Sequence, residues 1–289
     1  MDQIYVIKQS GEKELFSQDK VLASMQRVGV PEALWPRAVE HIKKNLHQDI
    51  KTNEIFSHIL EYLKDKDRNA SVKFNLKQAI FQLGPTGFPF ERFMERVFQN
   101  MGYKTQVDLI LEGECVNHEV DIFLEKDGKK GIVEAKFHNQ QGVKTDIHVA
   151  LYTYARFLDL KEKNNISEIW LVTNTKLTEE AITYSKCKNM DIIAWNYPQG
   201  ASLQDLVGNP KMYPITILNE LSEQEKQLFI ENNIIFCDQL LNKEKFNFNG
   251  NFIIKEEKLN RIKNSVNMIL NGNGEKVSAS HDEFFKNLN

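Results

Sequence analysis

The stretch His118–Lys136 reads HEVDIFLEKDGKKGIVEAK and contains two apolar runs separated by an Asp-Gly turn. In the first run, apolar side chains occupy every second position: Val120, Ile122 and Leu124. This pattern predicts a β-hairpin. Because side chains repeat every two residues along a strand, Glu134 and Lys136 share one face, and Asp121 comes close to them on the neighbouring strand. The stretch is therefore a candidate cation site with an amine beside it.

The composition is that of a globular protein with more than one domain. The chain has 289 residues, of which 41% are hydrophobic and 27% are charged, and its net charge is −3. This length fits two or three domains, and the charge gives no overall nucleic-acid signature. The cysteines are odd in number and in no metal spacing: Cys115, Cys187 and Cys237. No stretch approaches the roughly 20 apolar residues of a membrane span. We expect a reducing, cytoplasmic location.

The elements around the hairpin predict an α/β sandwich over residues 85–200. A helix over residues 90–101 precedes the hairpin, and a helix over residues 146–161 follows it. Two buried strands, 169–173 and 191–195, come next, with a helix capped by Thr178 between them. This order predicts a mixed sheet in which the late strands are parallel. Within residues 146–161 we expect a core stripe and, beside it, a face with His148, Tyr152 and Arg156; the stripe comprises Ile147, Leu151, Tyr154 and Leu158.

Two further domains are expected on either side. Residues 1–84 begin with a strand-like hairpin and continue with helices, so they predict a β-hairpin plus a helical bundle that ends at Gly84-Pro85. Residues 201–289 predict a mostly helical region in which Ser222 and Glu225 form a capping box. Its segment Ile234–Leu241 is similar to part of a helix-hairpin-helix unit, and structural packing is favoured over DNA binding there.

The N-terminal residues resemble the ATP-cone, a nucleotide-sensing domain found at the front of many ribonucleotide reductases. The residues that match are Val6-Ile-Lys8, Gly11, Phe16, Lys20-Val21 and the ending Phe74-Asn-Leu-Lys77-Gln-Ala-Ile-Phe-Gln-Leu-Gly84. The resemblance implies ATP or dATP bound over the hairpin, with Lys8, Gln9 and Lys20 at the phosphates. The family usually has arginine at the position of Gln9, and the loss of a charge-assisted contact would weaken triphosphate binding.

The central residues resemble the PD-(D/E)XK nuclease superfamily, and within it the Mrr-like restriction endonucleases. Asp121 ends one strand, Glu134-Ala-Lys136 ends the next, and a helix that opens with Phe90-Glu91 precedes them. The later matches are Leu171-Val-Thr-Asn174, Thr178-x-x-Ala181 and Tyr184. The resemblance implies Mg²⁺ or Mn²⁺ held by Asp121 and Glu134, with Lys136 at the attacking water and Glu91 as an accessory carboxylate. Oxygen ligands suit such hard cations.

The sequence thus favours a metal-dependent DNA endonuclease of restriction or phage-defence type, regulated by ATP or dATP and assembled as a homo-oligomer. Two alternatives stay open: a nucleotide-responsive regulator that binds nucleic acid without cleavage, and a nuclease that acts on RNA or branched DNA. Direct roles for His118, Glu119 and His138 are not fixed by the pattern. The superfamily often has a glutamine on the helix after the site, where this chain has His148 and Tyr152.

Overall fold

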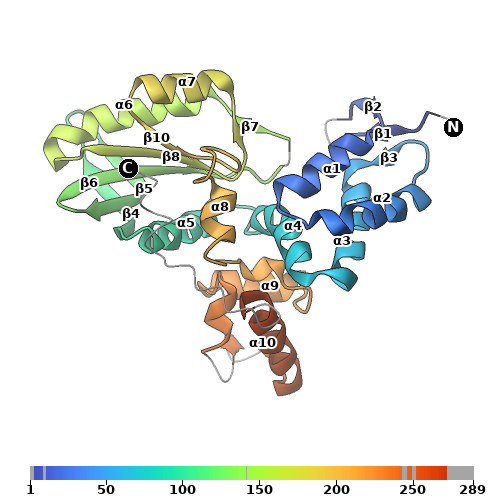
Figure 1. The fold of residues 1–289 in the computed structure, drawn as a ribbon. Coiled ribbons are helices and arrows are strands. Elements are labelled where there is room, and N and C mark those ends of the chain that lie inside the picture. Colours follow the sequence, from blue (N-terminus) through green and yellow to red (C-terminus); the bar gives the residue numbers. More distant parts are fainter. Residues whose placement is uncertain (1–2, 9–10, 141, 243–245, 249–251, 272–289) are drawn as a thin grey trace. The chain divides into compact units, whose positions relative to one another are not determined.

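The computed structural model divides into two compact units, Met1–Leu76 and Lys77–Asn289. It describes residues 3–8, 11–140, 142–242, 246–248 and 252–271, which Figure 1 shows as a ribbon. Helix α4 (Arg68–Phe81) crosses the boundary between the units. The division into domains 1–84, 85–200 and 201–289 stays a prediction.

The first unit has the predicted hairpin and helices, together with one strand that the pattern did not indicate. Strands β1 (Tyr5–Ile7) and β2 (Lys13–Leu15) are antiparallel, and β3 (Ile50–Lys51) adds to β1 in parallel. The helices are α1 (Gln18–Arg27), a 3₁₀ turn η1 (Glu32–Leu34), α2 (Trp35–Lys44) and α3 (Thr52–Lys66). Ser17 caps α1, because its side chain accepts a hydrogen bond from the amide of Lys20. A two-residue strand carries too little alternation to be found from sequence.

The second unit is built on a five-stranded mixed sheet with strand order β10-β8-β6-β5-β4. The strands are β4 (Lys104–Glu112), β5 (Asn117–Lys126), β6 (Lys129–Lys136), β8 (Glu168–Thr173) and β10 (Asp191–Ile193). Strands β4, β5 and β6 are antiparallel neighbours, while β6, β8 and β10 are parallel. The β5–β6 turn has positive φ at both Asp127 and Gly128, as a two-residue hairpin turn of this hand requires. The α/β fold with a mixed sheet is confirmed.

Helices cover both faces of this sheet (Figure 1). Helix α5 (Phe88–Asn100) packs on β4, β5 and β6, and its predicted apolar face is buried: Phe90, Phe93, Met94, Val97 and Phe98. Gly102 follows α5 with φ +87°, the left-handed conformation expected where a helix ends. Helices α6 (Ile147–Asn164) and α7 (Glu179–Cys187) lie together on the opposite face. Two short strands, β7 (Lys144–Thr145) and β9 (Lys176–Leu177), pair in parallel and each precedes one of these helices.

The predicted core stripe of α6 was wrong at its two leucines, whereas Tyr154 is partly buried against the core. Leu151 and Leu158 are each 43% exposed, whereas the buried positions of the helix are Ala150, Thr153 and Leu160. Small side chains at Ala150 and Thr153 let the helix backbone lie close to the sheet, and this rotates the larger apolar residues outward. An apolar-periodicity argument weights side-chain size and misses such contacts.

The C-terminal region contains short helices and one longer helix. These are α8 (Leu203–Gly208), η2 (Ile215–Ile217), α9 (Glu223–Glu231), η3 (Cys237–Leu240) and α10 (Glu256–Asn271), with a small hairpin of β11 (Asn247–Phe248) and β12 (Phe252–Ile253). The capping box of Ser222 and Glu225 is present at α9. The segment that resembled a helix-hairpin-helix begins as a buried extended stretch and ends in η3, and its assignment stays a prediction. Within the described residues, no helix is long and apolar enough to cross a membrane.

Candidate active site

Asp121 and Glu134 lie close together on neighbouring strands, each one residue beyond Ile122↔Val133, where the β5–β6 register ends. Asp121 Oδ2 accepts a 2.7 Å hydrogen bond from the amide of Ala135, the residue after Glu134. Glu134 shares a strand face with Ile132, which packs in the core under α6. The hairpin therefore brings two carboxylates together beneath α6, as the sequence predicted.

Helix α6 supplies a cation to this pair. Arg156 donates a 2.5 Å hydrogen bond to Glu134 Oε2, and both side chains are largely covered. The guanidinium also donates to the Tyr152 hydroxyl at 2.9 Å and lies 4.7 Å from the centre of that ring. Burial alone would lower the pKa of Arg156, but Glu134 and Tyr152 raise it. Tyr152 thus orients Arg156 toward the site.

The carboxylates are nevertheless poorly neutralised. Burial and the charge of Asp121 raise the pKa of Glu134 to about 7, although Arg156 and Lys136 act in the opposite direction. Burial also raises the pKa of Asp121, against the hydrogen bond from Ala135 and the charge of Arg156. One guanidinium is not enough for two buried carboxylates, so the metal-free site favours retained protons.

Glu91, on the first turn of α5, belongs to the same electrostatic group. Burial first, and then the charges of Asp121, Asp108, Glu119 and Glu134, raise its pKa to about 7. The two additional carboxylates were not among the predicted site residues. Asp108 faces Asp121 across β4 and β5 with φ +56°, and Arg92 of α5 binds it at 2.8 Å. A non-glycine residue in this conformation at mid-strand is strained, which is common beside functional sites.

Lys136 is the last residue of β6, and its side chain is exposed. The loop that follows it is held by hydrogen bonds. Its charge lowers the pKa of Glu134 and, second to burial, that of His138. His138 exchanges backbone hydrogen bonds with the buried Asn174 side chain at 2.9 and 2.8 Å. Its Nε2 lies 2.9 Å from the hydroxyl of Thr145, which in turn lies 2.8 Å from that of Thr173. His138 therefore anchors the loop after Lys136 to the end of β8.

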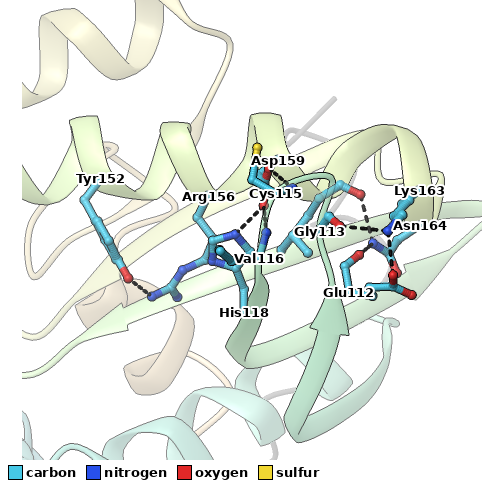
Figure 2. A network of polar contacts seen from close by, with 11 residues as sticks. Glu112, Gly113, Cys115, Val116, His118, Tyr152, Arg156, Asp159, Lys163 and Asn164 are labelled. Carbon is cyan, nitrogen blue, oxygen red and sulfur yellow. Dashed lines mark hydrogen bonds and ion pairs between the residues drawn. The ribbon is translucent and has the colours of Figure 1, made fainter.

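Other predicted neighbours lie elsewhere. His148 is 85% exposed at its side chain and contacts Asp146, the N-cap of α6, at 3.4 Å. His118 is bound to Asp159, whose carboxylate also accepts hydrogen bonds from the amides of Cys115 and Val116 (Figure 2). These donors, His118 first, hold the pKa of Asp159 far below its usual range. Asp159 raises the pKa of the Cys115 thiol, so this cysteine is not an activated nucleophile.

The predicted nucleotide-binding residues of the first unit are held by a shared carboxylate. Lys20 lies 2.7 Å and Lys8 3.1 Å from Glu14 Oε2, and Lys8 also contacts Glu12 at 3.2 Å. Gln9 lies outside the described residues. A pocket of about 520 Å³ lies between α1 and α2, but neither lysine lines it, and two of its lining residues are glutamates.

A signal for Arg156 was present in the sequence. Tyr152 and Arg156 stand four residues apart on one helix face, which is the spacing of a side-chain pair. Asp108 carried a weaker signal, an acidic residue within an otherwise strand-like run. Glu119 was considered only because it is close to Asp121 in sequence. Strand alternation does not reveal how far the Glu119 carboxylate lies from Glu91 on the preceding helix.

The comparisons define the class of this protein. A restriction endonuclease family model matches residues 85–204, and a model described as AF1548-like, C-terminal matches residues 213–270. The second unit therefore contains a restriction endonuclease-like domain of the nuclease superfamily. A crystal structure of the protein of unknown function AF1548 has a TM-score of 0.54 and 28% identity, over 65% of this chain and all of that one.

A protein of Archaeoglobus fulgidus described as uncharacterized is 38% identical over 144 residues, which is 50% of this chain and 81% of its own length. The chain belongs to the AF1548-like family that these matches define. The Transcriptional repressor NrdR of Dictyoglomus thermophilum is 37% identical over 25% of this chain and 53% of its own length. This likeness supports the ATP-cone resemblance and hence the fusion of a cone to an Mrr-like domain.

Proposed function

We propose that the protein is a metal-dependent endonuclease that hydrolyses phosphodiester bonds of DNA. The observation that carries the proposal is the closeness of Asp121 and Glu134 at one end of the β5–β6 hairpin, with Lys136 two residues further along. Burial and mutual repulsion raise the pKa of Glu134, and a carboxylate group assembled for stability alone would avoid this. The restriction endonuclease match over residues 85–204 supports the same chemistry.

The donor set fits a hard divalent cation. Asp121 and Glu134 offer carboxylate oxygens, and their raised pKa values show that cationic charge is in short supply. We assign Mg²⁺ or Mn²⁺ to these two residues, with Glu91 as an accessory carboxylate. A bound divalent ion supplies Lewis-acid stabilisation of the phosphate and a more acidic water.

The chain's own residues orient the substrate and the proton. Lys136 is exposed at the strand end, where its ammonium can contact the attacking water or the developing negative charge. With a cation on Glu134, the guanidinium of Arg156 would be free to leave that carboxylate and to contact a phosphate oxygen. Tyr152 keeps the guanidinium nearby through its hydroxyl. The anchored His138 loop fixes the backbone after Lys136.

Plasmid nicking tests the proposal. The purified chain with Mg²⁺ or Mn²⁺ is expected to convert supercoiled DNA to nicked or linear forms, and chelation should stop it. Asp121→Ala and Lys136→Ala should each abolish cutting, whereas Lys144→Ala, an exposed lysine at β7, should not. Undiminished cleavage by Asp121→Ala or Lys136→Ala contradicts the assignment. A panel of linear, methylated and branched DNA and RNA then separates the substrate classes.

We also infer that ATP or dATP binds the first unit near Lys8 and Lys20 and regulates the nuclease. The support is the likeness to NrdR and the ATP-cone pattern at the N-terminus. A ligand regulates only by binding two states with different affinity, so cleavage rate or homo-oligomer size should depend on nucleotide. Cleavage and sedimentation that both ignore ATP and dATP would remove this part of the proposal. A role in restriction or phage defence and a cytoplasmic location accord with it.

A non-cleaving regulator is the alternative, and the likeness to a transcriptional repressor is the observation that favours it. Its signature would be nucleotide-dependent DNA binding that survives Lys136→Ala, without strand breaks in any metal. The nicking assay therefore decides between the two functions.

A further inference from the structure

Two histidines and a glutamate converge on the outer side of the α2–α3 helix pair in the first unit. His41 lies on α2, and His58 and Glu61 lie one turn apart on α3. One ligand atom from each residue lies within 4.8 Å of the others. His41 Nε2 is 3.7 Å and His58 Nδ1 is 3.8 Å from the same Glu61 oxygen, Oε2. These distances are too long for hydrogen bonds.

The orphaned nitrogen of His41 is the second observation. His41 Nε2 is covered from solvent, yet it has no hydrogen-bond partner among the described residues. A buried polar atom without a partner has a free-energy cost, and natural structures rarely leave one unexplained. An ion between His41 and Glu61 would satisfy this atom without any rearrangement of the backbone.

The scaffold behind the cluster is rigid. Val39 and Ile42 flank His41, and Ile59 follows His58, and all three apolar side chains are buried in the core of this unit. Ligands held by packed helices keep their geometry before an ion arrives. Glu61 is 69% exposed at its side chain, so its carboxylate can close the last few tenths of an ångström. Ligand atoms on a tetrahedral ion with bonds of about 2.1 Å lie about 3.4 Å apart.

From this geometry we propose that His41, His58 and Glu61 form a binding site for a divalent transition metal of the Zn²⁺ class. Two imidazoles and one carboxylate suit Zn²⁺, whereas Mg²⁺ prefers oxygen ligands alone. The site cross-links α2 to α3 inside the first unit and leaves a coordination position for water. It is separate in sequence and chemistry from the carboxylate pair Asp121 and Glu134, and it does not depend on the nuclease proposal.

Metal titration of the full chain tests the site. The parent protein carries Asp121→Asn and Glu134→Gln, so that the carboxylate pair of the second unit binds no ion. Co²⁺ should give the visible absorption of a low-coordinate nitrogen and oxygen site, and competition with a chromophoric chelator should give one Zn²⁺ per chain with this signature. The apparent melting temperature should rise with Zn²⁺, because an ion that binds only the folded state stabilises it.

Substitutions at the ligands give the decisive result. His41→Ala, His58→Ala and Glu61→Gln should each weaken Zn²⁺ binding at least tenfold and remove the Co²⁺ spectrum. Glu61→Gln alters an exposed side chain and cannot fail by misfolding. His47→Ala is the matched control, because His47 pairs with Glu54 at 2.9 Å on the same unit without a third ligand. Unchanged binding by Glu61→Gln, or an equal loss in His47→Ala, overturns the site.

Discussion

Helix α6 takes part in two carboxylate clusters less than one turn apart: its Arg156 binds Glu134 of β6, and its own Asp159 binds His118 of β5. Glu134 and Asp159 leave similar fractions of their side chains exposed, 17% and 14%. Asp159 accepts hydrogen bonds from His118 and two backbone amides, and its pKa falls (Figure 2). Glu134 has one strong donor, Arg156, and its pKa rises because of burial first and the charge of Asp121 second.

The comparison teaches that the number of hydrogen-bond donors around a carboxylate helps to separate a structural carboxylate from a functional one. The Asp159 cluster is complete within the chain and ties α6 to the β4–β5 loop. The Glu134 cluster lacks positive charge, which accords with the proposed cation site. Variants should therefore affect stability at the first cluster and activity at the second.

The largest expected effect is the loss of cleavage in Glu134→Gln. We expect at least a hundred- to a thousandfold lower rate in metal-supplemented nicking, the usual cost of losing one group that stabilises the transition state. Folding should survive, because the amide removes a buried charge without changing shape. Asp159→Asn is the matched variant: it should keep most of its activity and lose several degrees of melting temperature. The comparison fails if the two variants exchange these phenotypes.

Gly113 gives the next largest effect, on stability. A Cβ at this position would lie 2.1 Å from Asp159 Oδ2 and 2.5 Å from the carbonyl oxygen of Val116. Gly113→Ala therefore displaces the loop from α6, and we expect it to lower the free energy of unfolding by about 1–3 kcal/mol. Denaturant unfolding measures this.

Glu114→Ala is the control, since its side chain is exposed in the same loop. Equal stability of the two variants would show that the loop does not depend on its approach to Asp159.

The pH dependence of stability should have opposite signs at the two clusters. The pKa of Glu134 is about 7 in the folded protein, against about 4.3 in an unfolded chain. The metal-free folded state therefore holds the proton to higher pH, and the free energy of unfolding falls as pH rises from about 4 to 7, by at most about 4 kcal/mol. The lowered pKa of Asp159 gives stability that is present above about pH 4 and lost in stronger acid.

Denaturant unfolding curves recorded between pH 4 and 8 in the presence of a chelator measure this fall in the free energy of unfolding. Glu134→Gln should make this fall shallower, with the rest due to Glu91 and Asp121, whose pKa values are also raised. Saturating Mg²⁺ should reverse it, because the cation favours the ionised carboxylates. A slope that is unchanged in Glu134→Gln would assign the titration to other groups.

The sequence predicted the sheet and much of the site, because both depend on local patterns. Alternation and an Asp-Gly turn were enough to place Asp121 beside Glu134. The sequence did not predict which face of α6 is buried. Ala150 and Thr153 are buried because their small side chains let the helix backbone approach the sheet, and hydrophobic periodicity does not detect this. The left-handed conformation of Asp108 was also invisible, because it arises from the sheet around it. Side chains that complete a site from a distant helix, such as Arg156, require the tertiary fold.

The smallest expected effect extends the comparison to the first unit. Glu14 accepts ion pairs from Lys8 and Lys20, the lysines assigned to phosphate, so a triphosphate must compete with this carboxylate. Glu14→Gln should release Lys20, leave Lys8 paired with Glu12 alone, and tighten ATP binding about two- to fivefold, as expected for exposed ion pairs. Calorimetric titration at low salt measures the change, with Glu40→Gln as a control that alters an unrelated exposed pair with Lys44. Weaker binding in Glu14→Gln would mean that this carboxylate positions the lysines rather than competing for them.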